Sequence, residues 1–334
     1  MRALFVEKFG RPEEMALKEV PSPRPGPGQV LIEVHAIGLN YPDLMSIAGT
    51  YQTLPPLPFV PGRELAGIVR AVGDGVRDFR PGMRVAAKME AGAFAEEVTA
   101  PAIYCYPIPD GISLLTAAAM GLAYLTAYFS LTDRAQLAPG EWVLVTGAAG
   151  GVGIAAVELS RALGAHALAG LTTMSKAAFV EAHGAEGVID LSVPDLRDSL
   201  RARVRALSQG HGADVVIDPV GGQVFEASLR ALAWGGRLVV VGFTSGGSGS
   251  VRANYLLIKH IAVSGIHWSD YRERQPARVA QAQSLLFDMV LAGKLRPPVM
   301  ATFPLERAAA ALAEIAERRV SGKVALLTRH AKEE

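Results

Sequence analysis

The chain has 334 residues, of which 50% are apolar and 19% are charged, a size and composition typical of a globular protein with about two domains. The 33 basic side chains nearly balance the 32 acidic ones, so the charge favours neither a nucleic-acid partner nor an acidic one. Cys105 is the only cysteine, which excludes an internal disulfide and any cluster of thiolate ligands. The N-terminus has no long apolar segment, and we expect a cytoplasmic protein that does not enter a membrane.

The first 110 residues have the pattern of an all-β segment, in which β-branched and aliphatic runs alternate with proline and glycine turns. The strands expected there are Ala3–Phe5, Val30–Ala36, Gly67–Val72, Arg84–Ala87 and Phe94–Val98. From Leu114 to Leu131 the pattern changes to two apolar helical pieces, with Ser113 as a candidate N-cap. The Ser, Thr and Tyr side chains in this stretch favour burial inside a protein over a membrane span.

Strands and helices alternate from Trp142 to Gly265, which predicts a doubly wound parallel sheet of the Rossmann type and an α/β fold class. Two helices, Gln275–Leu291 and Leu305–Val320, and a last strand, Lys323–Leu327, follow. The six strands expected in the sheet are Val143–Thr146, Ala167–Leu171, Val188–Ile189, Val215–Ile217, Leu238–Val241 and Ala262–Ser264.

A glycine-rich turn follows the first of these strands. Gly147, Gly150 and Gly153 have the spacing G-x-x-G-x-x-G and stand directly before an apolar-periodic helix. Glycines let a backbone turn sharply and approach a pyrophosphate, whose charge then lies among the unpaired N–H groups of a helix N-terminus. The turn alone fits either a dinucleotide site or an ordinary α/β connection.

Five further stretches carry a resemblance to a known family: Gly38–Asp43, Pro61–Gly67, Pro81–Val85, Asp218–Gly222 and Val241–Phe243. With the glycine-rich turn, they resemble the medium-chain dehydrogenase/reductase superfamily, and specifically its zinc-free quinone oxidoreductase branch, the zeta-crystallin-like group. The resemblance implies a β-rich GroES-like catalytic domain over residues 1–124, a Rossmann cofactor domain over 125–266 and a return to the catalytic domain over 267–334. It also implies a homodimer that pairs the strand around Ala262–Ser264 across a two-fold axis.

The resemblance bears on metal binding as well. Zinc-dependent relatives hold the catalytic zinc with a Cys, a His and a second Cys, and the matching positions here are Asn40, Arg63 and Leu122. None of these side chains is a serviceable Zn²⁺ ligand, and the seven histidines show no ligand spacing. We therefore expect no metal.

The residues after the second Rossmann strand bear on the choice of nicotinamide cofactor. NADH-preferring sites carry an Asp or Glu there, whereas this chain has Thr172, Thr173, Ser175 and Lys176. Hydroxyls and a lysine suit the 2′-phosphate of NADPH, and the family's matching residues contact it. The alternative is that Ser175 caps a helix and Lys176 is a solvated residue of its first turn.

Other cofactor contacts are implied by the resemblance alone. Thr126 matches a threonine near the nicotinamide, and the segment Ile266–Trp268 matches one that reaches the carboxamide. Lys323 resembles a phosphate-facing lysine or is a plain surface lysine. The full set of expected cofactor residues is Thr126, Gly150, Gly151, Val152, Gly153, Thr172, Ser175, Lys176, Val220, Gly242, Phe243, Thr244, Ile266, Trp268 and Lys323.

Without zinc, the substrate must accept hydride readily, as quinones and α,β-unsaturated carbonyls do. The spacing of Asn40, Asp43 and Tyr51 resembles that in quinone oxidoreductases and in enoyl-thioester reductases, where the matching tyrosine is the proposed proton donor. Asn40 is then expected to orient the substrate or the ribose, and Asp43 to fix the loop or to act directly. The sequence predicts an NADPH-dependent reductase of quinones or enones, with a 2-enoyl thioester reductase and a non-catalytic NADPH-binding protein as alternatives.

Overall fold

The computed structural model describes residues 1–331 and contains two compact units. Unit 1 comprises Met1–Leu122, Ser269–Ala292 and the residues from Pro297 onward, and unit 2 comprises Ala123–Trp268 and Gly293–Arg296. The divisions expected from the sequence, after residues 124 and 266, differ from these by two residues at each junction. The return of Gly293–Arg296 to unit 2 has no counterpart in the sequence-based expectation.

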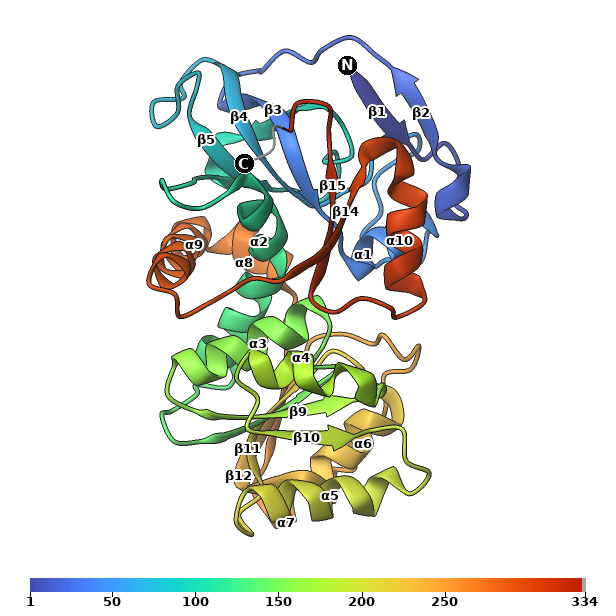
Figure 1. The fold of residues 1–334 in the computed structure, drawn as a ribbon, viewed down its shortest axis with the longest axis vertical. Coiled ribbons are helices and arrows are strands. Elements are labelled where there is room, and N and C mark those ends of the chain that lie inside the picture. Colours follow the sequence, from blue (N-terminus) through green and yellow to red (C-terminus); the bar gives the residue numbers. More distant parts are fainter. Residues whose placement is uncertain (332–334) are drawn as a thin grey trace. The chain divides into compact units, whose positions relative to one another are not determined.

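Unit 1 is built on a sheet that brings the two ends of the chain together. Its strands follow the order β14-β15-β3-β4-β5-β7, with β6 paired to β3, and β1 and β2 form a separate antiparallel pair. In Figure 1 the red strand β15 lies beside the blue strand β3, with which it pairs antiparallel from Ala325 opposite Gly38. The strands are β1 (Arg2–Phe5), β2 (Ala16–Glu19), β3 (Gln29–Gly38), β4 (Glu64–Val72), β5 (Arg84–Lys88), β6 (Glu97–Pro101), β7 (Cys105–Pro107), β14 (Val299–Pro304) and β15 (Lys323–Leu327).

Unit 1 is not all-β in its first part, which corrects the expectation from the sequence. Helix α1 (Tyr41–Ile47) follows β3, because Asn40 lies at its N-cap in an extended conformation and a proline stands in its first turn. The strand expected at Phe94–Val98 begins later, at Glu97, because Phe94 instead accepts the N–H of Leu4 through its carbonyl. The other helices of this unit are α8 (Trp268–Arg274), which begins at the last residue of unit 2, α9 (Pro276–Leu291) and α10 (Ala308–Ala316).

Helix α2 (Leu114–Phe129) is one continuous helix rather than two pieces, and a π-helical turn extends it to Arg134. Its residues up to Leu122 belong to unit 1 and those from Ala123 to unit 2. The segment Leu114–Arg134 is long and apolar enough to cross a membrane by length and composition, but 83% of its most apolar window is buried within the structure. This degree of burial is that of a core helix.

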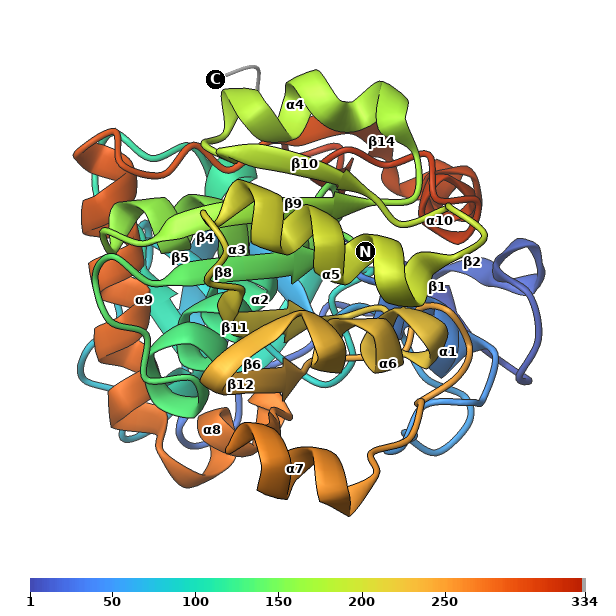
Figure 2. The same ribbon diagram turned by 90° about the horizontal axis from the view of Figure 1, so that it is seen from below.

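Unit 2 has the predicted Rossmann sheet, and all six expected strands are present. The parallel strands follow the order β10-β9-β8-β11-β12-β13, the doubly wound arrangement whose direction of winding reverses between β8 and β11. Figure 2 shows α5 and α6 together over one face of this sheet, and they pack on each other. The elements are β8 (Trp142–Thr146), α3 (Gly151–Ala162), β9 (His166–Leu171), α4 (Ala177–Ala182), β10 (Gly187–Asp190), α5 (Leu196–Leu207), β11 (Ala213–Asp218), α6 (Gly222–Ala231), β12 (Leu232–Val240), α7 (Ala253–Lys259) and β13 (Ala262–Gly265).

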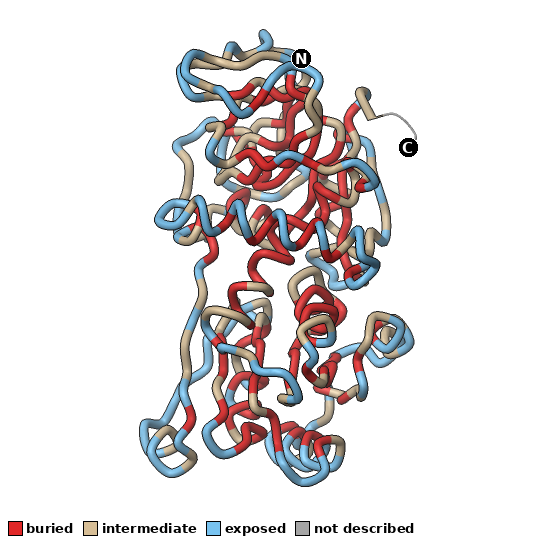
Figure 3. Tube along the Cα trace, turned by 90° about the vertical axis from the view of Figure 1, so that its left-hand side faces the viewer, coloured by how far each residue is buried: buried red, intermediate tan, exposed pale blue. Residues whose placement is uncertain are grey.

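Each unit has its own hydrophobic core, and Figure 3 shows buried segments inside each, with exposed segments around them. In unit 1, β3 and β4 contribute Ile32, Val34 and Leu65, all fully buried. In unit 2, Leu144 and Val216 of the central strands pack with Leu200 and Val204 of α5. These cores hold the strand ends, and the loops that follow them, in fixed positions.

Candidate functional site

The glycine-rich turn of unit 2 joins β8 to α3 with the close backbone approach that the sequence predicts. Gly147 has a φ of +57°. A Cβ atom on Gly153 would lie 2.2 Å from the carbonyl oxygen of Gly147, so only glycine lets the helix start so near the turn. Because α3 begins at Gly151, the N–H groups of Gly151, Val152 and Gly153 have no acceptor within the helix. This end of α3 is suited to an anionic group such as a pyrophosphate.

The loops at the carboxyl ends of β11 and β12 lie next to this turn. A methyl group of Val220 is 3.0 Å from the position of a Cβ on Gly147. The carbonyl of Pro219 accepts hydrogen bonds from the N–H and the hydroxyl of Thr244, and Gly242 donates its N–H to the carbonyl of Asp218. These contacts bring Val220, Gly242 and Thr244 to the point where the sheet's winding reverses, with Phe243 exposed among them.

Asp218 stabilises this edge of the sheet, a role that the motif match did not reveal. Its buried carboxylate accepts the hydroxyl of Thr146 at the end of β8, at 2.5 Å, and the N–H groups of Val220 and Gly221. Burial raises the pKa of the Asp218 carboxyl, while these hydrogen bonds oppose the rise. The carboxylate therefore fixes the loop after β11 against the strand that carries the glycine-rich turn.

The polar residues expected to select the cofactor follow β9 directly. Thr172, Thr173 and Ser175 are exposed, and the half-buried Lys176 has its pKa lowered by burial. Lys176 lies in a short 3-10 turn and is itself the N-cap residue of α4, so Ser175 does not stand at the N-cap of that helix. The capping alternative for Ser175 is therefore wrong.

The other expected cofactor residues of unit 2 have different settings. Thr126 is buried in α2, where its carbonyl accepts the hydroxyl of Ser130. Ile266 follows β13 and donates its N–H to the carbonyl of Val240. His267 is exposed, whereas Trp268 is buried. Their contact with a cofactor stays a prediction.

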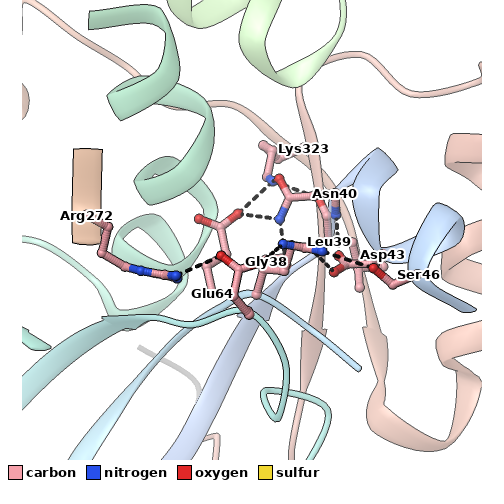
Figure 4. Close-up of polar contacts among 10 residues, drawn as sticks. Gly38, Leu39, Asn40, Asp43, Ser46, Glu64, Arg272 and Lys323 are labelled. Atoms are coloured by element: carbon pink, nitrogen blue, oxygen red, sulfur yellow. Dashed lines mark hydrogen bonds and ion pairs between the residues drawn. The ribbon is translucent and has the colours of Figure 1, made fainter. Parts of the chain in front are cut away.

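A second polar centre lies inside unit 1, around the fully buried Glu64 at the start of β4. Figure 4 shows its carboxylate facing Asn40 and Lys323. Oε1 accepts the amide Nδ2 of Asn40 at 2.9 Å and the Nζ of Lys323 at 2.8 Å, and Oε2 accepts the N–H of Leu122 at 2.6 Å. Burial alone would raise the pKa of Glu64, but the charges of Lys323 and Lys88 outweigh it and hold the pKa below its ordinary value.

Lys88, at the end of β5, is the second cation beside Glu64, and its side chain is fully buried. Its Nζ lies 3.7 Å from Oε2 of Glu64 and has no hydrogen-bond partner among the described residues. A Cβ atom on Gly121 would lie 1.6 Å from this Nζ, so the glycine in α2 provides the space for the lysine. Burial lowers the pKa of Lys88 to about 8, and Glu64 opposes this change.

Lys323 and Asn40 are hydrogen-bonded to each other inside unit 1. Lys323 is 4% exposed and donates to the carbonyl of Leu39, to Oδ1 of Asn40 and to Glu64, so the surface-lysine alternative is wrong. The structure does not support a phosphate contact for its ammonium either, because all three hydrogen bonds are satisfied within unit 1. The amide of Asn40 is likewise engaged on both sides.

The third cluster joins Tyr51 and Asp43 through Arg63, which is 2% exposed. The Arg63 guanidinium lies over the ring of Tyr51, 4.1 Å from its centroid, and donates to the hydroxyl of Ser46 at 3.0 Å and to the carboxylate of Glu90. Its Nε is 4.0 Å from Oδ1 of Asp43, and neither atom has a hydrogen-bond partner among the described residues. Arg63 thus occupies the centre of this cluster.

Two acidic groups lie near this arginine: the carboxyl of Asp43 is buried, and the phenol of Tyr51 is partly buried. Burial raises the pKa of Asp43 to about 7, against the opposing charge of Arg63, while Oδ2 accepts the N–H of Asn40 at 2.8 Å. Burial also raises the pKa of the Tyr51 phenol, and the Arg63 charge again opposes the rise. Sequence reasoning did not anticipate the other members of this cluster, Glu90 and Arg272, which are joined by a 2.7 Å ion pair.

The donor chemistry of unit 1 does not fit zinc. The positions that match the family's ligands are an amide engaged on both sides, a buried guanidinium and an aliphatic side chain. Two buried ammonium groups, Lys88 and Lys323, stand beside the carboxylate of Glu64. Over residues 1–331 no group of three or more His, Cys, Asp or Glu side chains is arranged to hold a metal ion.

The chain matches two family models. Residues 26–110 match the alcohol dehydrogenase GroES-like domain, and residues 151–284 match the zinc-binding dehydrogenase model. Among curated proteins, quinone oxidoreductase-like protein 2 of Mus musculus is 36% identical over 327 residues, which cover 97% of this chain and 91% of that protein.

Two solved structures are also similar over the whole chain. The Escherichia coli quinone oxidoreductase complexed with NADPH has a TM-score of 0.90 and 30% identity, covering 98% of this chain and all of that one. A mycobacterial protein complexed with NADPH has a TM-score of 0.91 and 32% identity, with the same two coverages. This chain therefore belongs to the quinone oxidoreductase branch of the medium-chain dehydrogenase/reductase superfamily, and it is an oxidoreductase of that type.

Proposed function

We propose that the protein reduces quinones or α,β-unsaturated carbonyls with NADPH and without zinc. The observation that carries the cofactor choice is the loop after β9, where Thr172, Ser175 and Lys176 stand in place of a carboxylate. A carboxylate there would repel a 2′-phosphate, whereas hydroxyls and an ammonium group bind it through charge-assisted hydrogen bonds. The two similar structures complexed with NADPH support the same choice.

The residues of unit 2 fit a dinucleotide. The N–H groups of Gly151, Val152 and Gly153 would hold the pyrophosphate, and the glycine at position 153 keeps the backbone close enough to do so. The nicotinamide, when bound, supplies a hydride. Thr126, Val220, Thr244 and the segment around Ile266 remain the residues that we expect to position it.

The proposed chemistry requires one proton donor or hydrogen bond from the chain. Reduction of a conjugated acceptor adds a hydride and a proton, and the negative charge that develops delocalises onto oxygen. The Tyr51 phenol can donate to this oxygen, because a phenol is protonated at neutral pH and the neighbouring Arg63 charge stabilises the phenolate left after donation. We assign Asn40 and Asp43 to holding the start of α1, since both are engaged with other residues of unit 1.

The test is anaerobic oxidation of NADPH by metal-stripped protein, with NADH as the cofactor control. The acceptors are 1,4-benzoquinone, 9,10-phenanthrenequinone, a short enone and crotonyl-CoA. We expect turnover of a quinone or the enone, faster with NADPH and unchanged when Zn²⁺ is added. The Tyr51→Phe variant should lower kcat by about 100-fold if the phenol is the proton donor.

The other outcomes separate the alternatives. Turnover of crotonyl-CoA alone would assign the protein to the enoyl-thioester reductases. Tight NADPH binding without turnover of any acceptor would favour the non-catalytic NADPH-binding protein. A requirement for Zn²⁺ would contradict the zinc-free mechanism.

A further inference from the structure

Arg63 stands where zinc-dependent relatives have a ligand, and its buried guanidinium is held by hydrogen bonds to two side chains. Its Nη1 donates to Glu90 and its Nη2 to Ser46, and its side chain is 3% exposed. Glu90 is in turn paired with Arg272 of α8. The plane of the guanidinium is therefore fixed at its edge by residues of α1, of the segment after β5 and of α8.

The ring of Tyr51 covers this fixed plane. The 4.1 Å distance from Cζ of Arg63 to the ring centroid is that of a close cation–π contact, which is strongest when the cation is removed from water. Tyr51 lies outside any helix or strand, in the segment that follows α1, and the contact with Arg63 ties its ring to the residues around β4. The arginine therefore contributes to the direction of the phenol through the side chain.

We propose that Arg63 is the positioning residue of the reductase site, holding the phenol of Tyr51 in the direction from which it donates to the substrate oxygen. This inference rests on the proposed function, because it takes Tyr51 as the donor. The planar guanidinium is required for it, since a lysine would keep the charge but offer no flat surface for the ring. Arg63 touches neither substrate nor cofactor in this role and acts only through Tyr51.

Arg272 provides a matched control. It is also buried and paired with Glu90, but it stacks on Tyr104, with 4.7 Å between Cζ and that ring's centroid. Replacement of either arginine with Gln removes one buried cation from the same carboxylate. Both variants therefore lose an ion pair with Glu90, but Arg63→Gln also removes the contact with the Tyr51 ring and Arg272→Gln the contact with the Tyr104 ring.

The first measurement is ¹⁹F NMR of protein labelled with 3-fluorotyrosine, with Tyr51→Phe and Tyr104→Phe used to assign two signals. We expect Arg63→Gln to shift the Tyr51 signal and to raise its phenol pKa, because the opposing charge of Arg63 is lost, while Arg272→Gln shifts mainly the Tyr104 signal. Arg63→Lys should largely keep the phenol pKa but still shift the signal. An unchanged Tyr51 signal in a folded Arg63→Lys or Arg63→Gln variant would overturn the proposal.

The second measurement is kinetic. Arg63→Lys should lower kcat for quinone by about tenfold with KM changed less than twofold, because only the direction of the donor is lost. In a Tyr51→Phe background the same substitution should change kcat by less than twofold. Additive effects would contradict action through Tyr51. If the wild type reduces no acceptor, the proposed function fails, but the NMR signals still decide whether Arg63 orients the phenol.

Discussion

The glycine-rich turn allows a test that separates packing from cofactor binding within one loop. In Gly153→Ala the new Cβ would lie 2.2 Å from the oxygen of Gly147 and 2.7 Å from Cα of Ala148. Ordinary carbon–oxygen contacts are about 1 Å longer, so backbone atoms must move. In Gly150→Ala the Cβ meets only the Gly147 oxygen, at 3.4 Å, and the φ of −79° suits alanine.

The expected effects follow from these distances. Overpacking of this kind costs about 1–3 kcal/mol, and alanine's helix propensity at position 153 returns less than about 1 kcal/mol. The net cost is then up to about 2 kcal/mol, so Gly153→Ala should speed amide hydrogen exchange in β8 and α3 by up to about 30-fold and weaken NADPH binding at least tenfold. Gly150→Ala should leave exchange unchanged but weaken NADPH binding, because its Cβ occupies the space through which a pyrophosphate approaches.

The assays are hydrogen exchange read by mass spectrometry over residues 142–162 and fluorescence titration with NADPH. Equal exchange in the two variants would refute the packing argument. Unchanged NADPH affinity in Gly150→Ala would refute the placement of the pyrophosphate at this turn.

Three further predictions concern other parts of the chain. Lys176→Ala should weaken NADPH binding by about tenfold and leave NADH binding unchanged, measured by titration with both cofactors; equal losses would contradict a 2′-phosphate contact. The pKa of Asp43 is raised to about 7 in the folded protein. Between about pH 4 and 7 the folded protein therefore binds a proton at this carboxyl that the unfolded chain does not bind. The contribution of the carboxyl to the free energy of unfolding falls as the pH rises through that range. Asp43→Asn should therefore gain stability relative to the wild type between pH 5 and pH 8 in urea unfolding, whereas a difference independent of pH would mean that the carboxyl is ionised throughout. The exposed Ala262 of the edge strand β13 should lie at the proposed homodimer contact, so Ala262→Lys should lower the dimer fraction in analytical ultracentrifugation while the exposed control Ala178→Lys does not.

The sheet of unit 2 was predictable because its strands are short, apolar and separated by helices of ordinary length. Each central strand is buried on both faces, which gives continuous runs such as Val143–Thr146. The turn residues at the strand ends follow directly from the same pattern. The local sequence pattern therefore predicts most of the strands and helices of this unit, and the glycine-rich turn of its candidate cofactor site.

Unit 1 was harder to predict because its pairings are distant. β2, β7 and β14 are short or half exposed, and β14 and β15 join a sheet begun by β3, nearly 300 residues earlier in the chain. Helix α1 has only seven residues, too few for a periodic signal, although its N-cap and proline were present in the sequence.

The buried charges of unit 1 show the same limit. Lys323 and Asn40 are separated by 283 residues, and nothing local places Lys88 beside Glu64 or Arg272 beside Glu90. One sequence signal was available: an isolated glycine, Gly121, inside an apolar helix often marks close packing. The structure shows that the group packed there is the ammonium of Lys88.

Burial of so many charges is costly, and hydrophobic residues of similar volume would often pack with equal or greater stability. Two cations surround Glu64, and two more surround Glu90, with the Asp43 carboxyl beside Arg63. A zinc site would supply positive charge through an ion that its ligands must hold in place. Here the chain supplies it covalently, and the guanidinium adds what an ammonium group or a hydrophobic residue lacks, a flat surface with fixed hydrogen-bond directions. Hydrophobic replacement of Arg63 could therefore restore packing but not the orientation of Tyr51, which gives a functional reason for retaining a buried arginine at this position.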